Sequence, residues 1–147
     1  MNRKIISNLI KFICVKYPYS NELSKARLTK LIYLIDWESS KRVGTQVTDI
    51  EWYFDSFGPF VSDVYDVATE DSNINVVNTK TVYGSRKTLI NYSGEVPEID
   101  CIVAEIAEKV INDTKHLNFD DFIKFVYSTS PIKNSSRYSY LNFSEFH

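Results

Sequence analysis

The chain has 147 residues, the usual size of one domain, and its 44% hydrophobic and 24% charged residues are typical of a globular protein. This composition excludes an intrinsically disordered chain, and the net charge of −2 at pH 7 provides no overall positive charge for general nucleic-acid binding. Aromatic residues are frequent at 14%, which indicates a dense core or an aromatic binding surface, and a core is the more common reason.

The N-terminal part of the chain predicts two helices. Residues 3–17 repeat apolar side chains on one helical face, and Pro18 ends that helix. Ser24 is a typical N-cap for a second helix, which runs to about Arg42 and ends before Gly44. Apolar side chains extend well beyond one stripe of this second helix, so we expect it to be buried on several sides.

The next segment is rich in aromatic and β-branched residues. Their alternation predicts a strand near residues 48–57. Gly58 and Pro59 then break the strand, and Pro59 suits the first turn of a helix because it lacks only an N–H that would be unpaired there. We therefore expect a short helix over about residues 59–70.

A hairpin is predicted near residues 74–92, because two β-rich runs flank Gly84 and Ser85. An amphipathic helix follows over residues 98–113, and its inward face is expected to consist of apolar side chains. These are Ile99, Ile102, Val103, Ile106 and Val110.

Asn118 is expected to cap the last helix, which runs to about Tyr127 and is ended by Pro131. Residues 128–147 contain few aliphatic side chains, and we expect them to form an extended C-terminal tail. The sum is a single α+β domain over residues 1–147, mainly helical, with a small antiparallel sheet.

We expect no enzyme, no metal site and no cofactor. The two histidines, His116 and His147, have no partner at a known metal-ligand spacing, and neither is placed to act as the base of a Ser–His or Cys–His dyad. The four glycines form no phosphate-binding motif, and the paired carboxylates are best explained as a solvated face.

Asp36 interrupts the apolar surface of the second helix and has two interpretations. It is a structural carboxylate that accepts hydrogen bonds from backbone or Trp N–H groups, or it anchors the Gly58–Pro59 loop or a partner. The Gly58–Pro59 pair likewise has either a purely backbone role or, with flanking aromatic residues, a role as a partner-binding knob.

A winged-helix DNA-binding protein is an alternative, because the order of helices, strand and hairpin resembles that topology. The hairpin tip carries Lys80, Arg86 and Lys87 as a wing. The helix that would read DNA carries only acidic charges, which phosphates would repel, so this alternative is the weaker one.

One string of residues has a recognisable order and spacing, which consists of Leu28, Leu31, Tyr33, Asp36, Trp37, Gly44, Trp52, Gly58, Pro59, Val64 and Tyr65. This string resembles the signature of the Panacea family, also called SocA-like antitoxins. The family pattern is a helix of the type KL-x-KLLYLADW followed by a tryptophan and a YGPV-type turn. Ile32, Ile35, Phe57 and Phe60 are conservative departures.

The resemblance implies an antitoxin that neutralises a cognate small toxin by direct contact, and in one branch a proteolytic adaptor that delivers the toxin to a cellular protease. The residues expected to form the motif scaffold or to bind the partner are Tyr33, Asp36, Trp37, Trp52, Gly58, Pro59, Phe60 and Tyr65. Aromatic residues of the tail are a second candidate contact, namely Tyr138, Tyr140, Phe143 and Phe146.

We expect no membrane partner, because the chain lacks a run of 18 apolar residues and a signal-peptide core. The two cysteines, Cys14 and Cys101, have no paired spacing that would indicate a disulfide framework. We therefore expect a cytoplasmic protein.

Overall fold

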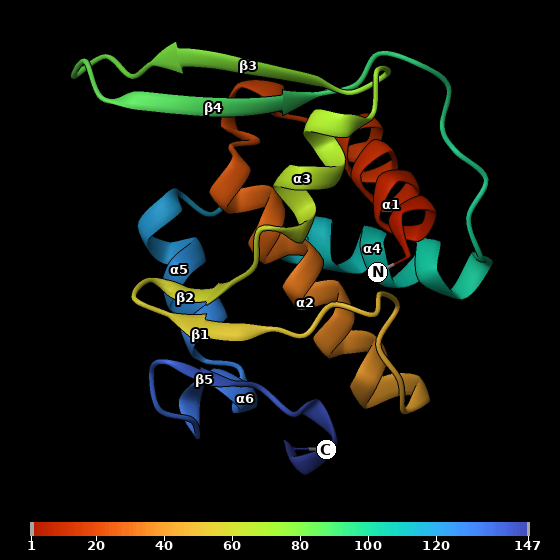
Figure 1. The fold of residues 1–147 in the computed structure, drawn as a ribbon, viewed down its shortest axis with the longest axis vertical. Helices are drawn as coiled ribbons and strands as arrows, with labels where there is room; N and C mark the ends of the chain where they lie inside the picture. Colours follow the sequence, from red (N-terminus) through yellow and green to blue (C-terminus); the bar gives the residue numbers. More distant parts are fainter. Residues whose placement is uncertain (1, 147) are drawn as a thin grey trace.

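The computed structural model describes residues 2–146 and has an α+β fold (Figure 1), which confirms the predicted fold class. Within these residues the helices are α1 (Arg3–Lys16), α2 (Lys25–Val43), α3 (Asp63–Glu70), α4 (Cys101–Thr114), α5 (Phe119–Tyr127) and α6 (Ser130–Lys133). Two 3-10 turns are η1 (Ser20–Glu22) and η2 (Phe143–Phe146). The strands are β1 (Tyr53–Asp55), β2 (Gly58–Phe60), β3 (Asn75–Lys80), β4 (Arg86–Asn91) and β5 (Ser139–Tyr140). They form two antiparallel sheets, of order β2–β1–β5 and β3–β4.

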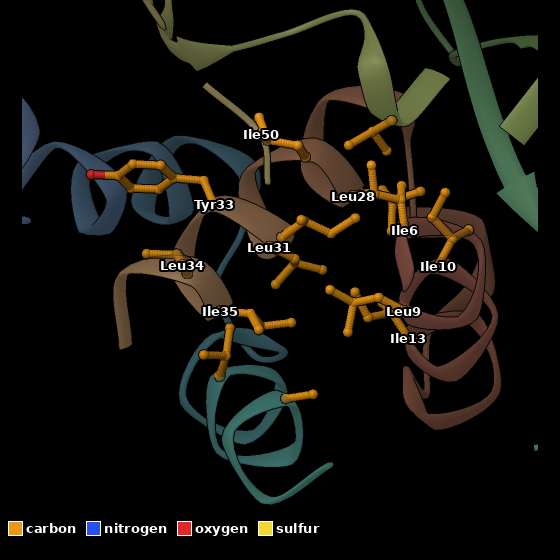
Figure 2. Close-up of a cluster of buried hydrophobic side chains, with 14 of the residues drawn as sticks. Ile6, Leu9, Ile10, Ile13, Leu28, Leu31, Tyr33, Leu34, Ile35 and Ile50 are labelled. Carbon is orange, nitrogen blue, oxygen red and sulfur yellow. The ribbon is translucent and has the colours of Figure 1, made fainter. Parts of the chain in front are cut away.

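Helix α2 is the centre of the fold. The Ser24 side chain caps its N-terminus by accepting from the backbone N–H of Arg27, and Gly44 ends it with a left-handed φ of 86°. Helices α1, α3, α4 and α5 all contact it, as predicted for a helix that is apolar on several sides. Figure 2 shows part of this core, where Ile6, Leu9, Ile10 and Ile13 of α1 face Leu28 and Leu31 of α2.

Two cationic residues of α2 are also buried, which no sequence pattern predicted. Arg27 is 2% exposed, and its guanidinium donates to the hydroxyl of Tyr17 at 2.8 Å and to the carbonyl of Leu117 at 3.0 Å. It also lies over the ring of Phe122. Arg27 therefore connects α2 to the end of α1 and to the segment that leads into α5.

Lys30 is 5% exposed, and among residues 2–146 no carboxylate lies within ion-pair distance of its ammonium. Burial lowers the pKa of Lys30, and the charge of Asp55 opposes that shift only in part. The charged form of this side chain therefore destabilises the folded state.

Replacing Lys30 by Met should raise the free energy of unfolding at pH 7 by about 1 kcal/mol, because an apolar side chain has no charge to desolvate. The unfolded chain keeps the lysine proton until about pH 10.4, whereas the folded chain loses it earlier, so wild-type stability rises as the pH increases through that interval. The advantage of Met should therefore shrink at alkaline pH. Urea unfolding at several pH values measures this effect, and exposed Lys80→Met is the control. An advantage that grows with pH would contradict the prediction.

The predicted strand over residues 48–57 is wrong in extent, because only Tyr53–Asp55 pairs as a strand. Backbone N–H groups of Val47 and Thr48 donate to the carboxylate of Asp36 instead of to a neighbouring strand. This contact holds the preceding segment as an irregular loop in spite of its β-rich composition.

The predicted helix start at Pro59 is also wrong. The chain turns at Ser56 and Phe57, and Gly58–Phe60 returns as strand β2 beside β1. Proline is tolerated here because β2 is an edge strand, where one side of the backbone needs no partner. Helix α3 begins only at Asp63.

Gly58 has a φ of 105°, and a Cβ at this position would lie 3.2 Å from the Tyr127 ring. Gly58→Ala should therefore cost about 2 to 3 kcal/mol of stability, because backbone strain and a tight contact add together. Gly84 is a matched control: its φ is 83°, but a Cβ would meet nothing within 4 Å. Gly84→Ala should cost only about 1 kcal/mol. Equal losses in thermal or urea unfolding would show that the contact with Tyr127 contributes nothing.

The hairpin predicted near residues 74–92 is confirmed as β3 and β4. It projects over one end of the molecule (Figure 1). The inner strand β4 is attached to the body, because the N–H of Ile90 donates to the carbonyl of Leu23 at 3.1 Å.

The predicted cap of α5 is confirmed, because the Asn118 side chain accepts from the backbone N–H of Asp121. Helix α4 is capped by Asp100, which was not predicted, and its side chain accepts from the backbone N–H groups of Ile102 and Val103. The predicted inward face of α4 is wrong at Ile102, which is 46% exposed, because α4 begins at Cys101 and packs through its later turns. Its buried residues are Ile106, Ala107, Val110, Ile111 and Thr114.

Residues 130–146 are folded, so the expected extended tail is wrong there. Pro131 lies in the first turn of α6 rather than only ending α5. Strand β5 then pairs with β1, and η2 inserts Phe143, which is 3% exposed, against α2. The ring of Phe143 lies 5.5 Å from that of Tyr33 and 5.6 Å from that of Trp37, between centroids. A few aromatic contacts thus replace the missing aliphatic ones.

Candidate partner-binding face

The carboxylate of Asp36 is completely buried and organises the loop that leads into β1. Its Oδ1 accepts from the backbone N–H groups of Val47 and Thr48, both at 2.9 Å. Its Oδ2 accepts from the Thr48 hydroxyl at 2.5 Å, from Trp52 Nε1 at 2.9 Å and from Gln46 Nε2 at 3.2 Å. Asp36 therefore holds residues 46–52 in place, and none of these five donors belongs to the Gly58–Pro59 turn.

Burial raises the pKa of Asp36 to about 6, while the hydrogen bonds from Thr48, Trp52 and Val47 oppose this rise because they favour the charged form. The group is thus ionised at neutral pH, where every one of its five donors finds an acceptor. A buried charge with this many donors is a structural element rather than a contact for a partner.

The other motif residues of α2 and the following loop are also interior. Tyr33, Trp37 and Trp52 are each at most 5% exposed, and the Tyr33 ring lies 5.5 Å from that of Trp52. The hydroxyl of Tyr33 forms a 2.8 Å hydrogen bond with that of Thr129. These three side chains join α2 to the sheet and to the start of α6.

The motif residues around the turn lie nearer the surface. Gly58 and Pro59 are buried, whereas Phe60 is half-buried. Tyr65 of α3 is half-buried as well, and the ammonium of Lys25 lies 4.3 Å from the centre of its ring. Of the eight predicted site residues, only Phe60 and Tyr65 therefore present side chains to solvent.

Phe60 belongs to a row of three rings that crosses the sheet, which we call the aromatic ladder: Phe60, Tyr53 and Tyr140. Tyr53 is the register partner of Phe60 on β2 and of Tyr140 on β5. Directly opposed residues of an antiparallel sheet share one face, so the three rings lie on the same side. The rings of Tyr53 and Tyr140 are 5.1 Å apart with an angle of 68°, and Tyr140 is 70% exposed.

The opposite side of the same sheet is the buried side. Phe54, 4% exposed, alternates with Tyr53 and packs edge-on against Tyr127 of α5. The backbone N–H of Tyr138 donates to the carbonyl of Phe54, and that of Leu141 to the carbonyl of Trp52. The aromatic ladder is therefore held on a rigid support that is anchored through the Asp36 network.

Two hollows flank the aromatic ladder and share Asp49, Glu51 and Tyr140. One has a volume of 560 Å³ and is lined by the ladder together with Asp63. The other has a volume of 690 Å³ and continues toward Asn142. Because the two hollows share these three residues, they adjoin each other, and we call the pair the groove.

Further aromatic side chains border the sheet at its turn. Phe57 is 82% exposed at the β1–β2 turn, and Tyr138 is 63% exposed. The hydroxyls of Ser56 and Tyr138 lie 3.2 Å apart, and Tyr138 has a φ of 68°, which is rare for a residue other than glycine. The second predicted contact set therefore divides: Tyr138 and Tyr140 are exposed, Phe143 is buried, and Phe146 packs partly against the core.

No group of three or more His, Cys, Asp or Glu side chains within residues 2–146 is arranged to hold a metal ion. His147 lies outside the described residues. In the same range, no helix is both long enough and apolar enough to cross a membrane.

Sequence reasoning missed Tyr53 and Glu51 as members of this face. The available signal was the alternation itself: Trp52 and Phe54 point inward, so Glu51 and Tyr53 point outward. The contact between Tyr140 and Tyr53 was also not predicted, because no local sequence pattern indicates that β5 pairs with β1.

Residues 28–131, more than half of the chain, match the family model described as "Antitoxin SocA-like, Panacea domain". This match confirms the resemblance inferred from the motif. No curated protein and no solved structure matches the chain.

Proposed function

Because the chain belongs to the SocA-like antitoxin family with a Panacea domain, we propose that it neutralises a cognate protein toxin by direct contact through the aromatic ladder. The observation that carries this proposal is the fixed row formed by Phe60, Tyr53 and Tyr140 on the outward side of an anchored sheet. Tyrosine and phenylalanine offer large contact areas with few rotatable bonds, so ordering them on binding costs little entropy.

Within this proposal the predicted site residues have two roles. Tyr33, Asp36, Trp37 and Trp52 are scaffold residues, since they are at most 5% exposed. Gly58 and Pro59 shape the turn, and Phe60 contacts the toxin together with its ladder neighbours. Tyr65 lies on α3, outside the ladder, and we assign it to the scaffold through its contact with Lys25.

The test is co-expression with the protein encoded next to this chain. That protein alone should stop growth, and the wild-type chain should restore growth and co-purify with it. Tyr140→Ala should weaken toxin binding at least about tenfold, because it removes the most exposed ring of the ladder. Tyr83→Ala is the matched control, since Tyr83 is 92% exposed on the β3–β4 hairpin.

Both variants should unfold at the wild-type temperature. Equal effects of the two substitutions on binding would remove the ladder from the interface. If the neighbouring protein does not stop growth, or does not co-purify with this chain, the antitoxin proposal itself is wrong. A shortened half-life of the toxin in the presence of this chain would replace occlusion by delivery to a cellular protease.

A DNA-associated role is the weaker candidate. It is favoured by Lys80, Arg86 and Lys87, since residues 72–94 contain no acidic side chain. It is opposed by α3, whose first turn carries Asp63 and Asp66. A gel shift with the chain's own promoter at 50 mM salt tests this role, and absence of a complex would exclude it.

A further inference from the structure

We infer that the groove beside the aromatic ladder binds a basic segment of the partner, with arginine or lysine side chains placed between the ladder rings and the carboxylates of Glu51 and Asp63. This inference rests on the proposed function, because it names the chemistry of the toxin surface that the ladder would meet. Its evidence is the distribution of charge around the groove.

The segment that builds the groove is acidic and contains no cation. From Val43 to Thr79 there is no lysine or arginine, whereas seven acidic residues occur in this span. They are Asp49, Glu51, Asp55, Asp63, Asp66, Glu70 and Asp71. The whole chain has nearly balanced charges, 17 basic against 19 acidic, so this is a local concentration.

The acidic residues of this segment differ in how their charge is compensated. Glu70 pairs with Arg3, and Asp71 pairs with Lys11 at 3.1 Å while accepting from the hydroxyl of Ser7. Glu51 and Asp63 have no ion-pair partner among residues 2–146. Glu70 and Asp71 thus lie against α1, whereas Glu51 and Asp63 line the groove.

The groove combines these charges with aromatic surface. Asp49, Glu51 and Asp63 line one hollow together with the three ladder rings. A guanidinium or ammonium group is attracted both to the face of an aromatic ring and to a carboxylate, and its carbon chain packs on the ring. An acidic or purely apolar segment would leave the carboxylates desolvated without a partner, which is unfavourable.

Contacts between a cation and the face of an aromatic ring already occur at other places in this chain. The Lys25 ammonium lies 4.3 Å from the centre of the Tyr65 ring, and the Arg137 guanidinium lies 5.6 Å from that of Phe54. Neither cation lines the groove, so the ladder rings there are available to cations of a partner.

The experiment uses the full chain labelled with ¹⁵N and two capped peptides of nine residues, one alternating Arg and Leu and one alternating Glu and Leu. The arginine peptide should shift the amide resonances of residues 49–63 and 139–141, and raising the salt concentration from 50 to 300 mM should weaken its binding. The glutamate peptide should leave these resonances unchanged.

The double variant Glu51→Gln with Asp63→Asn should weaken binding of the arginine peptide about fivefold. The matched control is Glu95→Gln with Asp120→Asn, which changes the net charge equally at two exposed carboxylates outside the groove. The control should leave binding within about twofold of wild type. Equal losses in both double variants, or shifts spread over all acidic surfaces, would overturn the inference.

The same variants separate this inference from the proposed function. Toxin that binds wild type and the Glu51→Gln, Asp63→Asn variant equally would overturn the basic segment but leave the antitoxin role intact. A second outcome is that the toxin binds neither protein while the arginine peptide still shifts the amide resonances of the groove residues. That outcome would overturn the antitoxin role and leave a groove selective for basic segments.

Discussion

Replacing Asp36 by Asn should lower the free energy of unfolding by about 3 kcal/mol, although the two side chains have nearly the same shape. An amide has one acceptor atom, whereas the carboxylate uses both oxygens to accept from five donors. The amide NH₂ would face donors such as Trp52 Nε1 or the backbone N–H groups, and these buried groups would lose their partner.

Urea unfolding of the two proteins at pH 7.5 measures this effect. Asp120→Asn makes the same chemical change at an exposed position of α5 and should alter stability by no more than about 0.5 kcal/mol. A loss below about 1 kcal/mol for Asp36→Asn would mean that the loop over residues 46–52 keeps its conformation without the carboxylate. In that case the anchoring of the ladder through Asp36 would also be wrong.

Phe143→Ala should cost about 4 kcal/mol, the usual range for removing a fully buried phenylalanine. The ring fills the space between Tyr33 and Trp37, and no polar group compensates for its loss. Because η2 begins soon after β5 ends, the substitution should also loosen the pairing of β5 with β1 and displace Tyr140 from the ladder.

Phe57→Ala is the matched control for Phe143→Ala. Phe57 is 82% exposed, so its removal should change stability by no more than about 0.5 kcal/mol. Thermal unfolding and the hydrogen exchange of β5 amides distinguish the two variants. Unchanged exchange at residues 139–140 in Phe143→Ala would show that β5 stays paired without the ring, contrary to our expectation.

The parts of the fold that the sequence predicted well depend on local interactions. Ser24, Gly44 and Asn118 act within one turn of the helix ends that they mark, so their residue types are sufficient signals. The β3–β4 hairpin is similar, because its two strands are adjacent in the chain.

The errors arise where distant groups decide the conformation. Residues 48–52 were predicted as part of a strand, but the carboxylate of Asp36 from α2 accepts hydrogen bonds from the N–H groups of Val47 and Thr48 at the start of this segment. Arg27 and Lys30 are charged residues, which usually lie at the protein surface, yet the packing of α1, α5 and the sheet buries them.

The candidate site divides in the same way. The motif pointed to Phe60 and to the interior residues that support it, whereas the ladder needs the cross-strand register of Tyr53 with Tyr140. No local pattern in the C-terminal segment predicts this register or the burial of Leu141 and Phe143 that accompanies it.

The separation of charge along the molecule has a kinetic consequence. The basic β3–β4 hairpin lies at one end of the long axis and β5, beside the acidic groove, toward the other (Figure 1), so two surfaces of opposite charge are separated and create a local field at the groove. Such a field turns an approaching cationic partner toward the acidic end before any contact forms. The association rate constant should therefore fall steeply with ionic strength, while the dissociation rate constant, set by the aromatic ladder, should change little.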